Sequence, residues 1–65
     1  MERFVFKTYE DRAMAENELY DVFGGYVYRD YTVYGDGYGL EILEECRDYE
    51  KAWRICRKHG GELSR

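Results

Sequence analysis

The sequence contains no proline, only one histidine and only two cysteines among its 65 residues. It also lacks repeats and low-complexity tracts, so no segment has the composition of an interdomain linker. A chain of this length forms one domain at most, and such a small domain buries only about 60% of the surface that its unfolded chain exposes. We therefore expect one compact domain, residues 1–65, of marginal stability.

The sequence favours neither a disulfide scaffold nor a membrane-spanning segment. Two cysteines are far fewer than a small secreted scaffold uses, so both thiols are expected to be reduced. The first residues, MERFVFKTYEDR, lack the apolar run and cleavage site of a signal peptide. No stretch approaches the roughly 20 apolar residues of a membrane span. The expected location is the cytoplasm.

Residues suited to catalysis or metal binding are few and poorly spaced. Cys46, Cys56 and His59 offer three soft ligands, whereas a structural zinc site normally has four with paired spacing. Glu44 and Glu45 are adjacent, so on a strand they point to opposite faces and make a poor acid and base pair. We expect a protein that is not an enzyme and that binds no metal or cofactor.

Hydrophobic periodicity and turn residues predict five elements, in the order β-α-β-β-α. These are a strand over Arg3–Thr8, a helix from the cap at Thr8 to Gly24, a hairpin of Tyr26–Tyr34 and Gly39–Glu45, and a helix between Asp48 and Gly60. The predicted class is α+β, with both helices on one sheet face. The order resembles a ferredoxin-like fold with a truncated last strand, a shape that hosts too many functions to indicate one.

Apolar spacing also predicts which side chains the helices bury. The first helix should bury Ala15, Leu19, Val22 and Phe23, and the second should bury Tyr49, Ala52, Trp53 and Cys56. The opposite side of the first helix would carry Glu10, Glu18 and Asp21 as a carboxylate stripe. Such a stripe is either a binding surface or simply the solvated side of the helix.

Alternation along the hairpin predicts the face that the helices leave open. If Val27, Tyr31, Val33, Leu40 and Ile42 point at the helices, the open face carries Tyr26, Tyr28, Asp30, Thr32, Tyr34, Glu41 and Leu43. This register also turns Arg29 inward, which is an awkward position for a base. The tyrosines then form either an exposed contact patch or only the margin of a small core.

Charge is unevenly distributed along the chain. Residues 10–50 contain twelve acids and three bases, although the net charge is only −4, and five of the eight tyrosines lie in residues 26–38. The last fifteen residues are basic, and bases in the last turn of a helix are favoured by its dipole. Dense carboxylates interleaved with tyrosine favour docking on a basic partner.

In this acidic and aromatic character, YVYRDYTVYGDGY and LEILEECRDYE resemble small phage-encoded inhibitors, among them anti-CRISPR proteins that mimic DNA. The basic segment KAWRICRKH departs from that pattern. The resemblance implies a basic nucleic-acid-handling partner, such as a CRISPR effector subunit, whose DNA-binding surface is blocked. The expected contact residues are Glu10, Glu18, Asp21, Tyr26, Tyr28, Asp30, Tyr34, Asp36, Glu41, Glu44 and Glu45.

Two alternatives accompany this interpretation. One is a small regulatory or assembly module that self-associates through its tyrosine-rich sheet face or its edges. The other is direct RNA binding by stacked tyrosines, which the negative charge disfavours because phosphates would be repelled. For an acidic decoy we expect a monomer that binds neither nucleic acid nor membrane directly, since burying unpaired carboxylates in a self-contact is costly.

Overall fold

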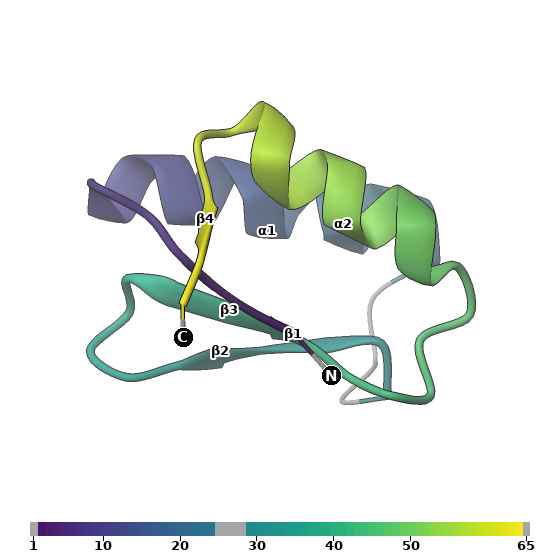
Figure 1. The fold of residues 1–65 in the computed structure, drawn as a ribbon. Helices are drawn as coiled ribbons and strands as arrows, with labels where there is room; N and C mark the ends of the chain where they lie inside the picture. Colours follow the sequence, from purple (N-terminus) through teal and green to yellow (C-terminus); the bar gives the residue numbers. More distant parts are fainter. Residues whose placement is uncertain (1, 25–28, 65) are drawn as a thin grey trace.

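The computed structural model describes residues 2–24 and 29–64. Its elements, in chain order, are β1 (Glu2–Val5), α1 (Tyr9–Phe23), β2 (Tyr31–Tyr34), β3 (Gly39–Ile42), α2 (Tyr49–Lys58) and β4 (Glu62–Leu63). The strands form one antiparallel sheet in the order β2-β3-β1-β4, and both helices cover the same face of it (Figure 1). The predicted α+β class is confirmed, and the last strand has only two residues.

Both helices begin at the residues that the sequence predicts. The Thr8 hydroxyl accepts a hydrogen bond from the Asp11 N–H at 3.0 Å, and the Asp48 carboxylate accepts one from the Lys51 N–H at 3.1 Å. The first helix ends at Gly24, which has a φ of 77°. These caps satisfy backbone groups that the helix itself leaves unpaired.

The bounds of the strands differ from the prediction. Among the described residues of the predicted strand Tyr26–Tyr34, β2 begins at Tyr31, after a turn at residues 29 and 30, and residues 26–28 lie outside the described part of the chain. The third strand ends at Ile42 because the chain then turns, with the Cys46 N–H donating to the Leu43 carbonyl at 3.1 Å. Glu44 and Glu45 therefore belong to the connection before α2 and not to a strand.

The core lies between the sheet and the two helices, and most of it follows from the predicted spacing. Its buried residues are Phe4, Phe6, Ala15, Leu19, Phe23, Leu40, Ile42, Ala52, Ile55 and Cys56. Trp53 packs edge-on against Phe4, with ring centroids 5.7 Å apart. The prediction is wrong for Val22, which is 39% exposed. Successive helix residues point about 100° apart, so Val22 points away from the side on which Phe23 is buried.

The predicted alternation of the hairpin is confirmed at its centre. Leu40 and Ile42 are fully buried, and Tyr31 packs against the core. Val33 pairs with Leu40 and so shares its face, yet it remains 37% exposed because β2 forms the edge of the sheet. Thr32 then lies on the face that the helices leave open.

The alternation fails at the start of β2, where Asp30 is fully buried instead of pointing to solvent. The Arg47 backbone N–H donates to Asp30 Oδ1 at 2.9 Å, and the Arg47 guanidinium donates to both carboxylate oxygens at 2.8–3.3 Å. The same guanidinium donates to the Phe23 carbonyl at the end of α1. Arg29, predicted to point inward, is exposed in the turn before β2. One ion pair thus joins α1, β2 and the connection before α2.

The Asp30–Arg47 pair predicts a specific loss of stability. Asp30→Asn should lower the free energy of unfolding by about 1.5–3 kcal/mol at neutral pH, because a buried, charge-assisted set of hydrogen bonds is weakened. Chemical denaturation followed by circular dichroism measures the change. Asp21→Asn removes the same charge from an exposed site and should have little effect.

The same pair predicts how stability depends on pH. Its hydrogen bonds from Arg47 hold the pKa of the Asp30 carboxyl below its usual value. The stabilisation is therefore present above the unfolded pKa of about 3.9 and lost as the pH falls through the folded pKa. The Asp30→Asn variant should lack this part of the acid-dependent loss, and an identical pH profile for parent and variant would refute the assignment.

Candidate functional site

The open face of the sheet is closely packed around one tyrosine. The Tyr34 ring lies over Gly39, where an added Cβ would come within 2.4 Å of it. The Arg3 guanidinium lies 5.3 Å from the centroid of that ring, and Arg3 Nε is 3.4 Å from Glu41 Oε2. Glu41 lies on the open face, as the alternation predicts, but these neighbours leave it only 9% exposed. Tyr34 and Glu41 are thus held mainly by contacts within the sheet.

Glu18, expected in the carboxylate stripe of α1, pairs with the end of α2. Lys58 Nζ lies 3.0 Å from both carboxylate oxygens, and His59 Nε2 lies 2.8 Å from Oε1. The hydrogen bond from His59, followed by that from Lys58, holds the Glu18 pKa below its usual value. This carboxylate therefore stays ionised near neutral pH and is neutralised by its neighbours, which breaks the predicted stripe.

Three predicted contact residues, Glu10, Asp21 and Asp36, are exposed and are spread over two ends of α1. Glu10 lies in the first turn of α1 and Asp21 in its last turn, so about 16 Å of helix separates them. Asp36 is in the turn between β2 and β3, and this turn contacts the start of α1, because Arg12 Nε donates to the Gly37 carbonyl at 2.7 Å. Asp36 therefore lies toward the Glu10 end of α1 and away from Asp21. Tyr26 and Tyr28 lie outside the described residues.

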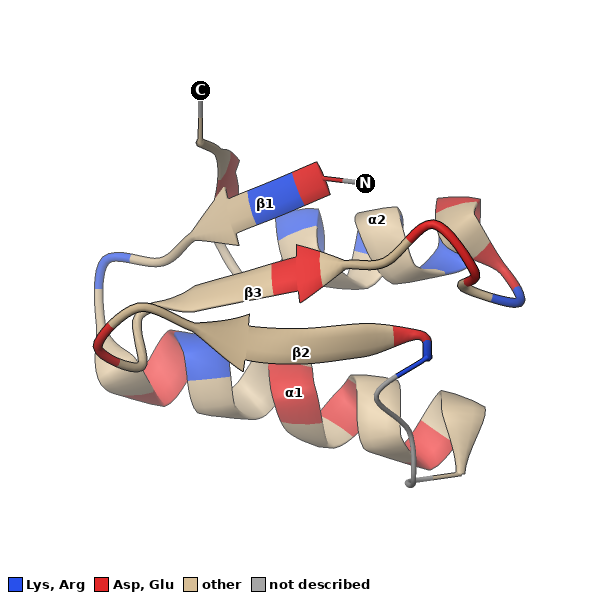
Figure 2. Ribbon diagram, turned by 90° about the horizontal axis from the view of Figure 1, so that it is seen from below, with Lys and Arg blue, Asp and Glu red and all other residues tan. Residues whose placement is uncertain are grey.

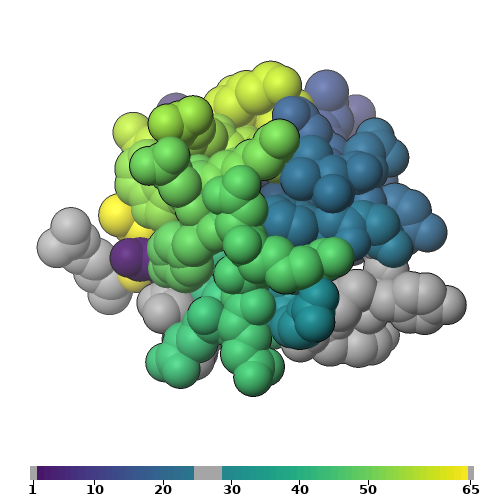
Figure 3. All heavy atoms as spheres, turned by 90° about the vertical axis from the view of Figure 1, so that its right-hand side faces the viewer, coloured from purple at the N-terminus to yellow at the C-terminus, as the bar shows by residue number. Residues whose placement is uncertain are grey.

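Four acids instead gather where β1 begins and β3 ends, and we call them the acidic end: Glu2, Glu44, Glu45 and Asp48. Glu2 pairs in register with Ile42, the last residue of β3. The pKa of Tyr49 is raised mainly by burial of its phenol and secondly by the charge of Glu2. The other three acids follow Ile42 in the connection to α2 and are exposed. Figure 2 shows the acidic positions at this end of the sheet, and Figure 3 shows that the connection projects from the molecule.

The base nearest in sequence to Glu44 and Glu45 is bound within the protein. Arg47 is the only base between residues 30 and 50, and its guanidinium is bound to Asp30 and the Phe23 carbonyl. The hydrogen bonds to Asp30 also raise the pKa of Arg47. Other bases flank this end: Arg3 follows Glu2, Arg29 precedes β2, and Lys51 lies in the first turn of α2. Glu44 and Glu45 are the sequence-predicted contact residues that lie in the acidic end, and nothing in the sequence near Arg47 indicates that this base binds Asp30.

The two thiols are poor nucleophiles. Cys56 is fully buried, and this burial raises its pKa to about 12. Burial also raises the pKa of Cys46. Both sulfurs are therefore protonated at neutral pH, and the thiolate is the reactive form. Among residues 2–24 and 29–64, no three His, Cys, Asp or Glu side chains are grouped so that they could hold a metal ion.

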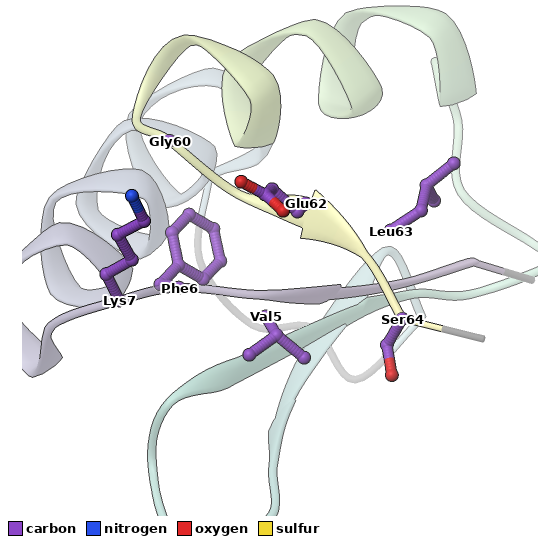
Figure 4. A pocket seen from close by; sticks show the side chains of 7 residues that line it. All are labelled: Val5, Phe6, Lys7, Gly60, Glu62, Leu63 and Ser64. Atoms are coloured by element: carbon purple, nitrogen blue, oxygen red, sulfur yellow. The ribbon is translucent and has the colours of Figure 1, made fainter.

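A small open hollow lies between the end of β1 and β4 (Figure 4). Its lining residues are Val5, Phe6, Lys7, Gly60, Glu62, Leu63 and Ser64. It offers one carboxylate, one ammonium group and one hydroxyl, with no histidine or cysteine beside the hydroxyl to activate it. The Ser64 hydroxyl therefore lacks the adjacent histidine that would activate it as a nucleophile.

The sequence matches no family model, and comparison with curated proteins and with solved structures found no significant similarity. Within the described ranges, no helix combines the length and apolar character required to cross a membrane. The surface chemistry of the chain is therefore the basis for assigning it a function.

The thiol environment predicts a measurable difference in reactivity. In the native protein at pH 7–8, Cys56 should resist alkylation by iodoacetamide, and Cys46, which is only partly buried, should react slowly. Unfolding in urea should make both thiols react at the rate of a free cysteine. Mass spectrometry of timed samples gives the two rates, and rapid native labelling of Cys56 would contradict the buried placement.

Proposed function

We propose that the protein is a non-catalytic binding protein that blocks a basic nucleic-acid-binding surface on another protein. The observation that carries this proposal is the acidic end, where exposed carboxylates project while the base nearest in sequence is bound internally. A surface of this kind attracts a basic groove over a long range and competes for it with phosphates. The target class is the one that the resemblance to anti-CRISPR DNA mimics implies, such as a CRISPR effector subunit.

The way the connection between β3 and α2 is held favours binding. The Arg47 backbone N–H is tied to Asp30, and the Leu43 N–H donates to the Asp30 carbonyl at 3.0 Å. Asp48 is fixed as the cap of α2. Carboxylates on a segment that is already ordered lose less conformational entropy on binding than carboxylates on a free loop.

Several acids outside the acidic end are paired with bases of the same chain. Five acids are bound to bases within the described residues, namely Glu16, Glu18, Asp30, Glu41 and Glu50. Their partners include Lys58 and Arg54 of the basic segment. Part of the positive charge that would be unexpected in a DNA mimic is therefore neutralised within the protein. The acidic end carries none of these five acids.

Charge reversal tests the location of the binding surface. The double variant Glu44→Lys and Glu45→Lys should lose binding to a basic, DNA-binding target, mainly through slower association and added repulsion. Its fold should be retained because both side chains are exposed. Immobilised protein can capture the target from nuclease-treated bacterial lysate, and double-stranded DNA added afterwards should displace it.

A matched variant separates position from net charge. Glu10→Lys with Asp21→Lys makes the same change in net charge on exposed positions of α1 and should still capture the target. Raising the salt concentration should weaken capture by the parent, since exposed charge pairs are screened. Equal loss in both double variants would mean that only net charge matters. Simultaneous binding of DNA and this protein would rule out the blocking mechanism.

A further inference from the structure

The second strand, β2, is an uncharged strand at the edge of the sheet. Its sequence is YTVY, and the strand order places β3 on one side of it and no described strand on the other. Exposed edges are usually protected by lysine, proline, a bulge or a covering segment, because their free backbone groups can pair with another chain. Residues 31–34 include no charged residue and no proline.

The hydrogen-bonding phase of the hairpin shows which backbone groups face away from β3. The Leu43 N–H donates to the Asp30 carbonyl at 3.0 Å, so these two residues form a hydrogen-bonded pair just beyond the end of the ladder. Hydrogen-bonded and non-hydrogen-bonded pairs alternate in an antiparallel ladder. Thr32 therefore bonds to β3, whereas the N–H and C=O groups of Tyr31 and Val33 point to the open edge.

An apolar side chain accompanies these backbone groups. Val33 lies on the helix side of β2 and is 37% exposed. A strand added at this edge would cover Val33.

We propose that β2 pairs antiparallel with β2 of a second copy of this chain, across a twofold axis at Thr32. Tyr31 then lies opposite the partner's Val33 on the helix side, and the two Thr32 residues face each other on the open side. Aromatic pairs with β-branched residues and threonine pairs are both favourable across antiparallel strands. This register also gives each outward N–H and C=O of Tyr31 and Val33 a hydrogen-bonding partner.

The charges that flank β2 complement one another in this arrangement. Arg29 precedes the strand and Asp36 follows it, and both are exposed. An antiparallel twofold pairing brings Arg29 of one copy near the partner's Asp36, and the reverse contact forms at the other end. The expectation of a monomer depends on like-charged carboxylates, and β2 contains none. The proposal does not depend on the identity of any target of the acidic end.

Sedimentation velocity over a micromolar concentration series tests the dimer directly. The parent protein should approach twice its mass of 7.9 kDa as concentration rises. Val33→Lys should raise the dimer dissociation constant by about tenfold or more, because each copy then places a positive charge in the interface between the two β2 strands. Val5→Lys makes the same substitution at a 43% exposed position of β1, away from the edge, and should leave the dimer intact.

Charge exchange tests the register. Arg29→Glu alone and Asp36→Arg alone should each weaken the dimer, and the combined variant should restore it. Circular dichroism confirms that each variant is folded. A parent that remains monomeric throughout the series, or a Val33→Lys variant that dimerises as well as Val5→Lys, would overturn the proposal. Failure of the charge exchange to restore the dimer would overturn the proposed register.

Discussion

The ion pair between Asp30 and Arg47 is the contact on which the rest of the architecture depends. A fully buried carboxylate is costly unless its hydrogen bonds are satisfied, and here one base supplies both its backbone N–H and its guanidinium. Because that guanidinium also reaches the Phe23 carbonyl, the end of α1 is tied to the start of β2. The same pair orders the segment that carries Glu44 and Glu45.

Local sequence signals predict the fold well because its helices and strands are specified by caps and by alternation within each element. Thr8 and Asp48 are helix caps that act over three residues, and Leu40 and Ile42 alternate within a single strand. Such patterns depend only on the period of each element. The type and order of the elements could therefore be derived without any knowledge of tertiary contacts.

The site was predicted less well because it depends on contacts between distant residues. Asp30 fits an alternating strand pattern, and only its pairing with Arg47, 17 residues later, explains its burial. Glu18 fits an exposed helix position, but its partner Lys58 is 40 residues away. Periodicity gives the direction of a side chain and cannot reveal which opposite charge the fold brings to it.

The basic segment near the end of the sequence has a structural role, and its charge is therefore compatible with an acidic binding surface on another part of the molecule. Lys58 and His59 meet Glu18 where α2 packs beside α1, so these charges join the two helices. Cations in the last turn of α2 also interact favourably with its dipole. The departure of this segment from a uniformly acidic chain thus reflects helix packing.

A dimer through β2 would change how the acidic end is presented. The connection that carries Glu44 and Glu45 lies at the end of the sheet where β2 starts, because Leu43 is paired with Asp30. Antiparallel pairing puts the two strand starts at opposite ends of a continuous sheet, so two acidic ends would face away from each other. Such a dimer can occupy two basic sites together only if their spacing matches, and its avidity then exceeds the affinity of either end. Spacing between sites, in addition to charge, would then select the target.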